Sequence, residues 1–370
     1  MTPDAFEFER FCDDLGPAQV VHLHDPSSGL RAVLVVDNVA CGVSLGGVRM
    51  AADVSVDEVF RLARAMTLKN AGAGLPHGGG KAGILADPKS SDRERLIRAF
   101  ACAIRTLTDY VPGPDMGTDE TCMAWIHDEI GRAVGLPRVI GGIPLDEIGA
   151  TGFGLTACAE VAAPFCGLEL SGARLAIEGL GNVGRPAARF LAEKGVVLVA
   201  ASDSTGAVHD SEGLDVDALI AAKAASGSVT GYEGGEKISN EALFEVPCDI
   251  LIPAARPDCI HEGNVDAIQA RLIIQGANIP ATAAAEARLH ERGVLVVPDF
   301  IANAGGVICA SVEFHGGSEV SALEQIAAKI VKNTREVLRA VRDEGFSPRK
   351  AAVRLAQRRV EAAMGLRRAF

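Results

Sequence analysis

The sequence predicts an α/β protein of two domains, of which the second is built on a parallel sheet. Its 370 residues are too many for one ordinary hydrophobic core, so two domains are expected. From about residue 175, short apolar strands are separated by glycine turns and helices, as in a parallel sheet. We expect an α/β domain over residues 1–140, the parallel-sheet domain over 141–320, and C-terminal helices over 321–370 that pack back on the first domain.

Boundary signals predict three helices in the first domain. Residues 55–58, Ser-Val-Asp-Glu, have the form of a capping box, and apolar residues then follow helical spacing to residue 70. A second capping box at residues 91–94 opens the next helix. The third is expected from about residue 119 to residue 134, where a glycine follows.

Three consecutive glycines precede Lys81 at the start of an apolar run. Glycines allow the backbone to approach a ligand closely, and a lysine held among apolar neighbours has a lowered pKa that suits proton transfer. Lys81 is therefore a candidate base. The alternative is a glycine-rich turn that carries a solvated lysine into a strand.

The second domain opens with a dinucleotide-binding pattern. A strand over residues 173–178 leads into a G-x-G-x-x-G segment, then a helix over 186–194 and a strand over 196–201. Gly179 permits the tight turn, Gly181 admits the pyrophosphate, and Gly184 allows close packing of helix and strand. This order predicts a Rossmann-type domain, although an ordinary strand-turn-helix unit has the same local pattern.

Asp203 follows the second strand of this unit. There it can accept hydrogen bonds from the adenine ribose, and its charge repels a 2′-phosphate, which favours NAD over NADP. Two alternatives remain: Ser202 and Ser204 can bind a phosphate, and Asp203 can cap a turn.

Composition excludes several classes of partner. The formal net charge of -12 argues against nucleic acid or an anionic membrane surface and favours a small-molecule substrate. The nine cysteines are scattered singly, with no Cys-x-x-Cys pair, so we expect reduced thiols in a cytoplasmic protein and no metal site. No run of eighteen uncharged apolar residues is present in the sequence, and no membrane span is expected.

Six segments of the chain resemble the glutamate/leucine/phenylalanine/valine dehydrogenase family. They are residues 66–70, 75–88, 114–119, 150–152, 275–278 and 303–307. The resemblance implies a two-domain enzyme that oxidatively deaminates an L-amino acid to a 2-oxo acid and ammonia with a nicotinamide cofactor. It also leads us to expect a homo-oligomer assembled through the first domain.

The resemblance implies roles for three charged residues. Lys69 binds the substrate α-carboxylate, Lys81 is the central acid-base group, and Asp115 exchanges protons with the amine and a bound water. As an isolated residue, Asp115 is equally well a turn or helix-cap residue. Further contacts implied by the family pattern are Gly46, Met66 and Val307 for the substrate, and Thr151, Asn182, Val183, Ala254, Ala255, Asn278 and Asn303 for the cofactor, beside the three glycines and Asp203.

Leu45 and Ala310 are the informative departures. In the glutamate branch the position of Leu45 is a lysine that binds the distal carboxylate, and the position of Ala310 is a serine for the same group. Burying a carboxylate against Leu45 costs on the order of several kcal/mol, so both changes favour an apolar substrate, branched-chain or aromatic. Residues 203–215 and 252–255 look more like the glutamate branch, which keeps glutamate dehydrogenase as the second hypothesis. A catalytically silent NAD-binding regulator of the same fold is the third.

Overall fold

The structure, a computed structural model, describes residues 7–367 and separates them into two units. The first unit comprises the described residues up to Pro144, Ala310–Glu319, and the described residues from Ala356. The second comprises Leu145–Cys309 and Val320–Leu355. Mixed helices and strands in both units confirm the α/β fold class.

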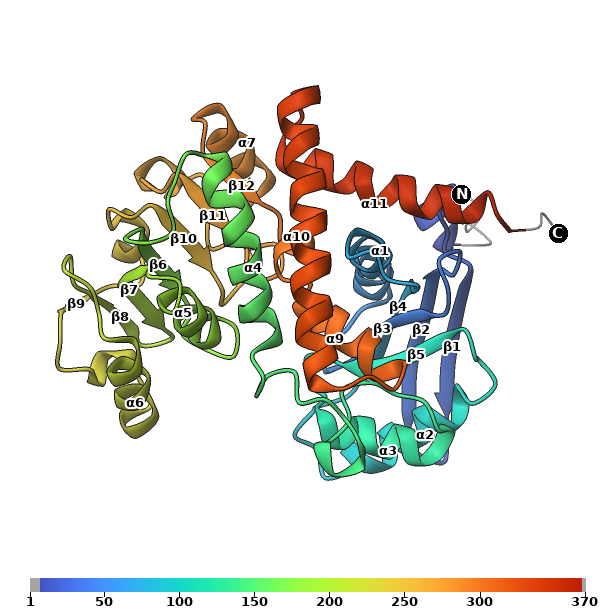
Figure 1. The fold of residues 1–370 in the computed structure, drawn as a ribbon. Coiled ribbons are helices and arrows are strands. Elements are labelled where there is room, and N and C mark those ends of the chain that lie inside the picture. Colours follow the sequence, from blue (N-terminus) through green and yellow to red (C-terminus); the bar gives the residue numbers. More distant parts are fainter. Residues whose placement is uncertain (1–6, 368–370) are drawn as a thin grey trace. The chain divides into compact units, whose positions relative to one another are not determined.

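A mixed five-stranded sheet forms the centre of the first unit (Figure 1). The strand order is β1-β2-β4-β3-β5; β2 runs antiparallel to β1 and β4, whereas β3 runs parallel to β4 and β5. The strands are β1 (Gln19–Asp25), β2 (Leu30–Asn38), β3 (Ser44–Ala51), β4 (Gly78–Leu85) and β5 (Tyr110–Pro114).

Helices cover both faces of this sheet. Helix α1 (Val56–Gly72) packs Phe60 and Ala63 against Val33 and Val35 of β2. The opposite face packs against α2 (Arg93–Ala103) and α3 (Glu120–Ile130). The lysine strand β4 therefore lies in the interior of a sheet that is buried on both sides.

The predicted helix boundaries have mixed outcomes. The capping box at residues 55–58 is confirmed, because the Ser55 side chain accepts a hydrogen bond from the Glu58 backbone N–H. The one at residues 91–94 is wrong: α2 begins at Arg93 after Asp92, and no side chain caps it. Helix α3 ends at Ile130 rather than at 134, because Gly131 takes the left-handed conformation that stops a helix.

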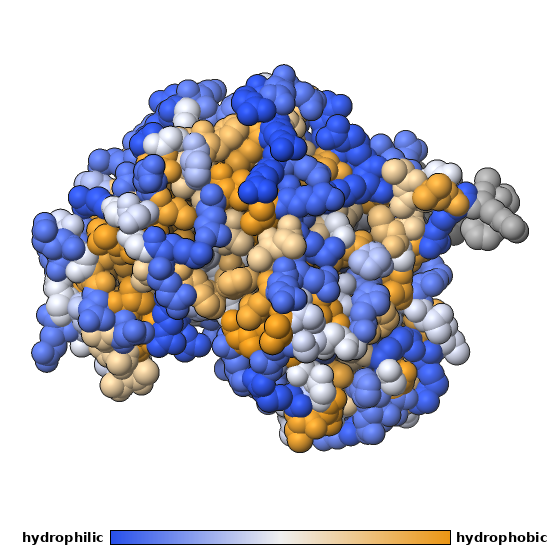
Figure 2. All heavy atoms as spheres, viewed as in Figure 1, coloured by the Kyte–Doolittle hydropathy of each residue, from blue (hydrophilic) through white to orange (hydrophobic). Residues whose placement is uncertain are grey.

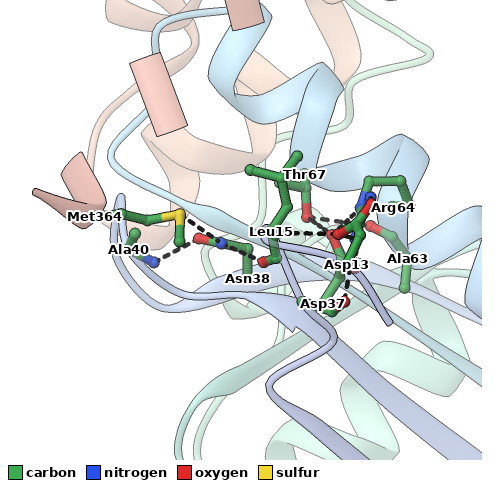
Figure 3. A network of polar contacts seen from close by, with 10 residues as sticks. Asp13, Leu15, Asp37, Asn38, Ala40, Ala63, Arg64, Thr67 and Met364 are labelled. Carbon is green, nitrogen blue, oxygen red and sulfur yellow. Dashed lines mark hydrogen bonds and ion pairs between the residues drawn. The ribbon is translucent and has the colours of Figure 1, made fainter. Parts of the chain in front are cut away.

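A buried ion network fastens α1 to β2 (Figure 3). The Asp37 carboxylate accepts a hydrogen bond from Thr67 Oγ1 at 2.5 Å and two from Arg64 Nε, at 2.9 and 3.1 Å. The same guanidinium donates to Asp13 at 2.7 Å. Asp37 is buried whereas the Asp13 side chain is half exposed, so the inner carboxylate depends on these partners.

The second unit is built on a seven-stranded sheet in the order β12-β11-β10-β6-β7-β8-β9 (Figure 1). The first five strands in this order are parallel, β8 is antiparallel to β7, and β9 is antiparallel to β8. The strands are β6 (Arg174–Glu178), β7 (Val197–Asp203), β8 (Gly206–His209), β9 (Glu236–Ile238), β10 (Ile250–Pro253), β11 (Leu272–Ile274) and β12 (Leu295–Val297).

Six further helices precede, connect or follow these strands along the chain. They are α4 (Ala150–Phe165), α5 (Gly184–Ala192), α6 (Val216–Ser226), α7 (Ala283–Glu291), α8 (Asp299–Ala302) and α9 (Gly305–Phe314). Short 3-10 helices occupy Glu7–Phe11, Arg138–Ile140, Val229–Gly231, Ala242–Glu245 and Val265–Ala267.

Two long helices, α10 (Glu319–Glu344) and α11 (Pro348–Met364), close the chain. Hydrophilic residues cover the C-terminal end of α10 on the face shown in Figure 2. In the C-terminal half of α11, Arg359 donates hydrogen bonds to the carbonyl oxygens of Ala71 and Gly72, at 3.0 and 2.9 Å. The last turn of α1 is thus capped by a side chain from the end of the chain. Among the described helices, none is long and apolar enough to cross a bilayer.

Candidate active site

Lys81 lies in the middle of β4, on the face of the sheet that α1 covers. Its side chain is 6% exposed, and Nζ lies 3.0 Å from Oδ1 of Asp115. Burial lowers the pKa of Lys81, and the charge of Asp115 opposes this effect. The solvated-turn alternative is therefore wrong, because this lysine lies buried inside a central strand of the folded chain.

Glycines on both sides of Lys81 explain how α1 can come this close to β4. A Cβ atom at Gly79 would lie 2.0 Å from the backbone nitrogen of Thr67, and one at Gly83 would lie 2.7 Å from Val59 Cγ2. Side chains alternate along a strand, so residues 79, 81 and 83 share a face. Lys81 is the one side chain of these three positions that fills the space under the helix.

Asp115 directly follows β5 and is bound by two cations. Its Oδ2 accepts a hydrogen bond from Arg49 Nε at 2.8 Å, while Oδ1 faces Lys81. Burial alone would raise the pKa of Asp115, but Lys81 and Arg49 outweigh it and lower the pKa. The Asp115 backbone N–H donates to Thr118 Oγ1 at 2.9 Å, which fixes the loop. The carboxylate is thus held ionised beside Lys81.

Lys69 lies in the last turn of α1 and is partly buried. The next residue, Asn70, is buried, and its amide donates to the carbonyl oxygens of Leu45 at 3.1 Å and Gly78 at 2.6 Å. These bonds join the end of α1 to β3 and β4. The sequence analysis missed this positioning role, because Asn70 and its partners belong to three different elements.

The predicted substrate residues of the first unit gather in an apolar cluster. Leu45 is 3% exposed and packs with Ala310, and Met66 lies against the cluster. Gly46 lies beside Leu45, and a Cβ there would be 3.5 Å from Met66 Cγ. The other members are Val43, Val111 and Val134. Val307, in contrast, belongs to the part of α9 that lies in the second unit.

Two polar side chains that the sequence did not reveal anchor the Ala310 segment. Ser311 Oγ lies 3.0 Å from Nε2 of the buried His77. Glu313 accepts hydrogen bonds from the backbone N–H groups of Leu136 at 3.1 Å and Ile143 at 2.9 Å. Burial raises the pKa of Glu313, against these bonds. The contacts of Ser311 and Glu313 thus hold the segment that carries Ala310 against the rest of the first unit.

In the second unit, the strand-turn-helix pattern is confirmed, and both ends of β6, α5 and β7 lie within two residues of the expected limits. Gly179 has a φ of 93°, and a Cβ there would lie 2.5 Å from Ala255 Cβ. A Cβ at Gly184 would lie 2.1 Å from the Gly179 oxygen, whereas one at Gly181 would meet nothing within 4 Å. Open space beside Gly181 at a helix N-terminus fits a pyrophosphate. The exposed Asn182 beside it donates to Asp146 at 2.9 Å, and Val183 immediately precedes the helix.

Asp203 ends β7, and its side chain is only 7% exposed. It accepts hydrogen bonds from Thr205 Oγ1 at 2.7 Å, from Ser228 Oγ at 3.2 Å and from the Val229 backbone N–H at 2.7 Å. Lys223 Nζ lies 3.3 Å away. Burial would raise its pKa, but these partners lower it to about 2. The carboxylate therefore caps a turn, as one alternative held, while the ribose contact stays a prediction.

Asn303 offers a further fit to the cofactor. Its amide nitrogen donates to the carbonyl oxygens of Gly276 at 3.1 Å and Ala277 at 3.3 Å, and to Oδ1 of Asn278 at 3.0 Å. Its own Oδ1 is buried with no hydrogen-bond partner among the described residues. A buried acceptor without a donor is costly unless a ligand supplies one. The carboxamide N–H of a nicotinamide has the required chemistry.

The other predicted cofactor contacts lie on two further segments of the second unit. Thr151 belongs to the first turn of α4, and a Cβ at Gly306 would lie 3.5 Å from its Oγ1. Ala254 and Ala255 follow β10, and the Ala255 backbone N–H donates to Glu178 at 3.0 Å. Ala255 therefore lies beside the Gly179 turn.

Comparison with known proteins agrees with these features. A family model described as Glutamate/Leucine/Phenylalanine/Valine dehydrogenase matches residues 141–368. A second, described as Glu/Leu/Phe/Val dehydrogenase, dimerisation domain, matches residues 17–132. Together the two models span most of the chain.

Among similar proteins, the glutamate dehydrogenase of Aeropyrum pernix is 40% identical over 89% of this chain and 85% of its own length. An NADP-specific glutamate dehydrogenase of Saccharolobus shibatae is 39% identical, covering 75% and 69%. An NAD-specific glutamate dehydrogenase of Staphylococcus aureus is 40% identical, covering 75% and 70%.

Two solved structures share the fold. The hetero-hexameric glutamate dehydrogenase of Thermus thermophilus, in a Leu-bound form, superposes with a TM-score of 0.84 at 31% identity over 96% of this chain and 91% of that one. The L-tryptophan dehydrogenase of Nostoc punctiforme gives 0.76 at 25% identity over 97% and 99%.

Proposed function

Because the chain belongs to the glutamate/leucine/phenylalanine/valine dehydrogenase family, we propose that it catalyses the reversible, NAD-dependent oxidative deamination of an apolar L-amino acid. The products are the 2-oxo acid and ammonia. Membership makes the chain an oxidoreductase that acts on a CH–NH2 group with a nicotinamide cofactor. The observation that carries the apolar preference is Leu45, which is buried in an apolar cluster with Ala310.

Three side chains of the first unit divide substrate binding and proton transfer between them. Lys69 holds the substrate α-carboxylate as a fixed cation. A bound nicotinamide would supply the acceptor for the hydride that leaves the substrate Cα. Lys81, whose burial favours the neutral amine, takes a proton from the water that attacks the substrate carbon, and Asp115 exchanges protons with the amino group.

The side chains of this cluster are apolar and offer no hydrogen-bond donor to a carboxylate. An apolar substrate side chain therefore fits the cluster better than a charged one. An unpaired buried carboxylate costs on the order of several kcal/mol, which disfavours glutamate. For branched-chain and aromatic substrate side chains, burial in the same cluster makes binding more favourable. Glutamate is the second candidate, because the curated relatives named above are glutamate dehydrogenases.

NAD is the proposed cofactor because the charge of Asp203, which is expected beside the adenine ribose, would repel a 2′-phosphate. The related glutamate dehydrogenases include both NADP-specific and NAD-specific enzymes, so family membership alone supports either cofactor. We further propose a homo-oligomer, since the first unit matches a dimerisation-domain model and a structural relative is hexameric. The nine cysteines are scattered singly along the sequence, and this pattern favours the cytoplasm as the location of the protein.

The decisive experiment is a spectrophotometric screen of the purified protein. L-amino acids are tested with NAD and NADP, and 2-oxo acids with the reduced cofactors and ammonia. Turnover of leucine, valine or phenylalanine above that of glutamate supports the proposal. If glutamate is the best substrate, the chain is a glutamate dehydrogenase and the proposed apolar preference is wrong. NADH binding without any turnover would instead indicate a catalytically silent regulator.

Lys81→Ala tests the acid-base assignment in the same assay. We expect kcat to fall by about a hundredfold or more while NADH binding is nearly unchanged. Lys89→Ala, which removes an exposed lysine after the same strand, is the matched control and should retain full activity. Retention of most activity in Lys81→Ala would refute the role of Lys81.

A further inference from the structure

We propose that Arg49, held in place by Glu58, is the positioning residue that keeps Asp115 ionised and leaves only one of its two carboxylate oxygens turned toward Lys81. The family resemblance implied no role for Arg49 or Glu58. This inference rests on the proposed function, because it describes how the acid-base pair of that reaction is prepared.

The four side chains form a row of alternating charges. Glu58 pairs with Arg49 NH1, Arg49 Nε donates to Asp115 Oδ2 at 2.8 Å, and Asp115 Oδ1 lies 3.0 Å from Lys81 Nζ. They come from α1, β3, the residue after β5, and β4, so the row runs across four elements of the first unit. Arg49 is only 14% exposed, and its two partners keep its charge from being buried alone.

The geometry divides the two oxygens of Asp115 between two cations. A Cβ at Gly47 would lie 2.7 Å from Asp115 Cβ, so β3 runs directly against this carboxylate. With Oδ2 bound to Arg49, only Oδ1 is turned to Lys81. The terminal torsion of an aspartate is broad, and without Arg49 both oxygens can turn toward the lysine. Arg49 therefore limits how strongly Asp115 can hold the ammonium form of Lys81.

Charge balance leads to the same conclusion. With all four groups ionised, two cations and two anions cancel. Removal of Arg49 leaves an excess negative charge beside Lys81, which favours the protonated amine. In agreement, Arg49 lowers the pKa of Lys81, whereas Asp115 and Glu58 raise it.

Other titratable groups near the pair do not replace Arg49. Tyr110 on β5 is buried and donates its hydroxyl to the Gly46 carbonyl oxygen at 2.8 Å. Burial raises the pKa of Tyr110, so it remains neutral. Lys69 is a further cation, in the last turn of α1, and in the proposed function its charge is matched by the substrate carboxylate.

The test is the pH dependence of kcat/KM in charge-changing and charge-keeping variants. In Arg49→Gln, the acid limb that reports loss of the proton from Lys81 should move to higher pH by roughly one unit. Arg49→Lys should restore the pH midpoint but keep kcat lowered about severalfold, because an ammonium keeps the charge but lacks the rigid planar fork that orients both carboxylates. Glu58→Gln should move the limb to lower pH. A role of Arg49 in folding alone would lower the amount of active enzyme and leave the midpoint in place.

The matched control is Arg98→Gln. Arg98 is also an arginine that pairs with several carboxylates, Glu94, Asp128 and Glu129, but it lies on the surface of α2. Its removal should leave the profile unchanged. If Arg49→Gln fails to fold, the opposite shift expected for Glu58→Gln and the normal midpoint expected for Arg49→Lys carry the test.

A second readout does not need turnover. The pH dependence of Lys81 acylation by acetic anhydride, measured by mass spectrometry of its peptide, reports the neutral amine directly. An unshifted Lys81 midpoint in Arg49→Gln, with amino acid turnover intact, would overturn this inference and leave the proposed function standing. A shifted midpoint in a protein that turns over no amino acid would support the inference and overturn the function.

Discussion

Exchange of Leu45 for lysine should convert the substrate preference of this enzyme. The Leu45 side chain is 3% exposed and belongs to the apolar cluster with Ala310, so a lysine there is buried. In the proposed function this position lies beside the substrate side chain. With leucine as substrate the new ammonium has no partner. With glutamate it pairs with the distal carboxylate.

The magnitude follows from that difference in pairing. Leaving one member of a buried ion pair alone costs about 3–5 kcal/mol, and each 1.4 kcal/mol is a factor of ten. We therefore expect the ratio of kcat/KM for glutamate to that for leucine to rise about 10²- to 4 × 10³-fold in Leu45→Lys. Adding Ala310→Ser supplies a hydroxyl donor and should contribute about a further 1 kcal/mol for glutamate. Ala310→Val alone should penalise phenylalanine relative to valine by about 1–3 kcal/mol.

The assay is kcat/KM for glutamate, valine, leucine and phenylalanine with each variant. Leu45→Met is the control, since it keeps the site apolar with nearly the same volume and should keep the native order of substrates. A native enzyme that prefers glutamate, or a Leu45→Lys variant with no gain on glutamate, would show that Leu45 does not contact the substrate side chain.

Two further predictions concern other sites. Asp203→Ser should raise the ratio of NADP to NAD efficiency, because it removes a negative charge and frees Lys223 for a 2′-phosphate; the ratio is measured as kcat/KM for each cofactor. Asp37→Ala should lower the free energy of unfolding by about 3–5 kcal/mol, since it leaves Arg64 and Thr67 in the network of Figure 3 without their buried acceptor; chemical denaturation measures the loss.

Each of these has a matched comparison. Adding Lys223→Gln to Asp203→Ser should abolish the gain with NADP, and a native preference for NADP would contradict the assignment of Asp203. For the ion network, Asp13→Ala removes the half-exposed carboxylate that binds the same guanidinium, and about 1 kcal/mol or less is expected. Equal losses for Asp13→Ala and Asp37→Ala would mean that burial does not determine the strength of the network.

Local signals were sufficient for some elements and not for others. The unit from β6 to β7 was predicted closely because its turns are marked by glycines at 179 and 195 in the sequence itself. The end of α3 was not, since Gly131 and Gly135 are both suitable stops and only the folded chain distinguishes them. Gly135 instead packs near Pro114, where a Cβ would lie 2.6 Å from the proline ring.

The candidate site, too, could be predicted only in part from the sequence. Lys81 was recognised from its glycines, but its burial inside a strand depends on α1, whose approach no local pattern encodes. Arg49 and Glu58 meet Asp115 only in three dimensions, so sequence spacing could not reveal their connection. Asp203 was found by its place after β7, yet its four internal partners come from a later loop and helix as well as its own turn.

The division of the chain between two units has a consequence for its synthesis. The first unit is assembled from three separate stretches, with residues 145–309 and 320–355 inserted between them. A nascent chain that has emerged only to Pro144 lacks Ala310 in its apolar cluster and Arg359 on the last carbonyls of α1. The half that holds Lys81 is thus completed last, after the nucleotide-binding sheet, and contacts so distant in sequence are slow to form. Neither half of this enzyme can be produced intact by cutting the gene at a single point.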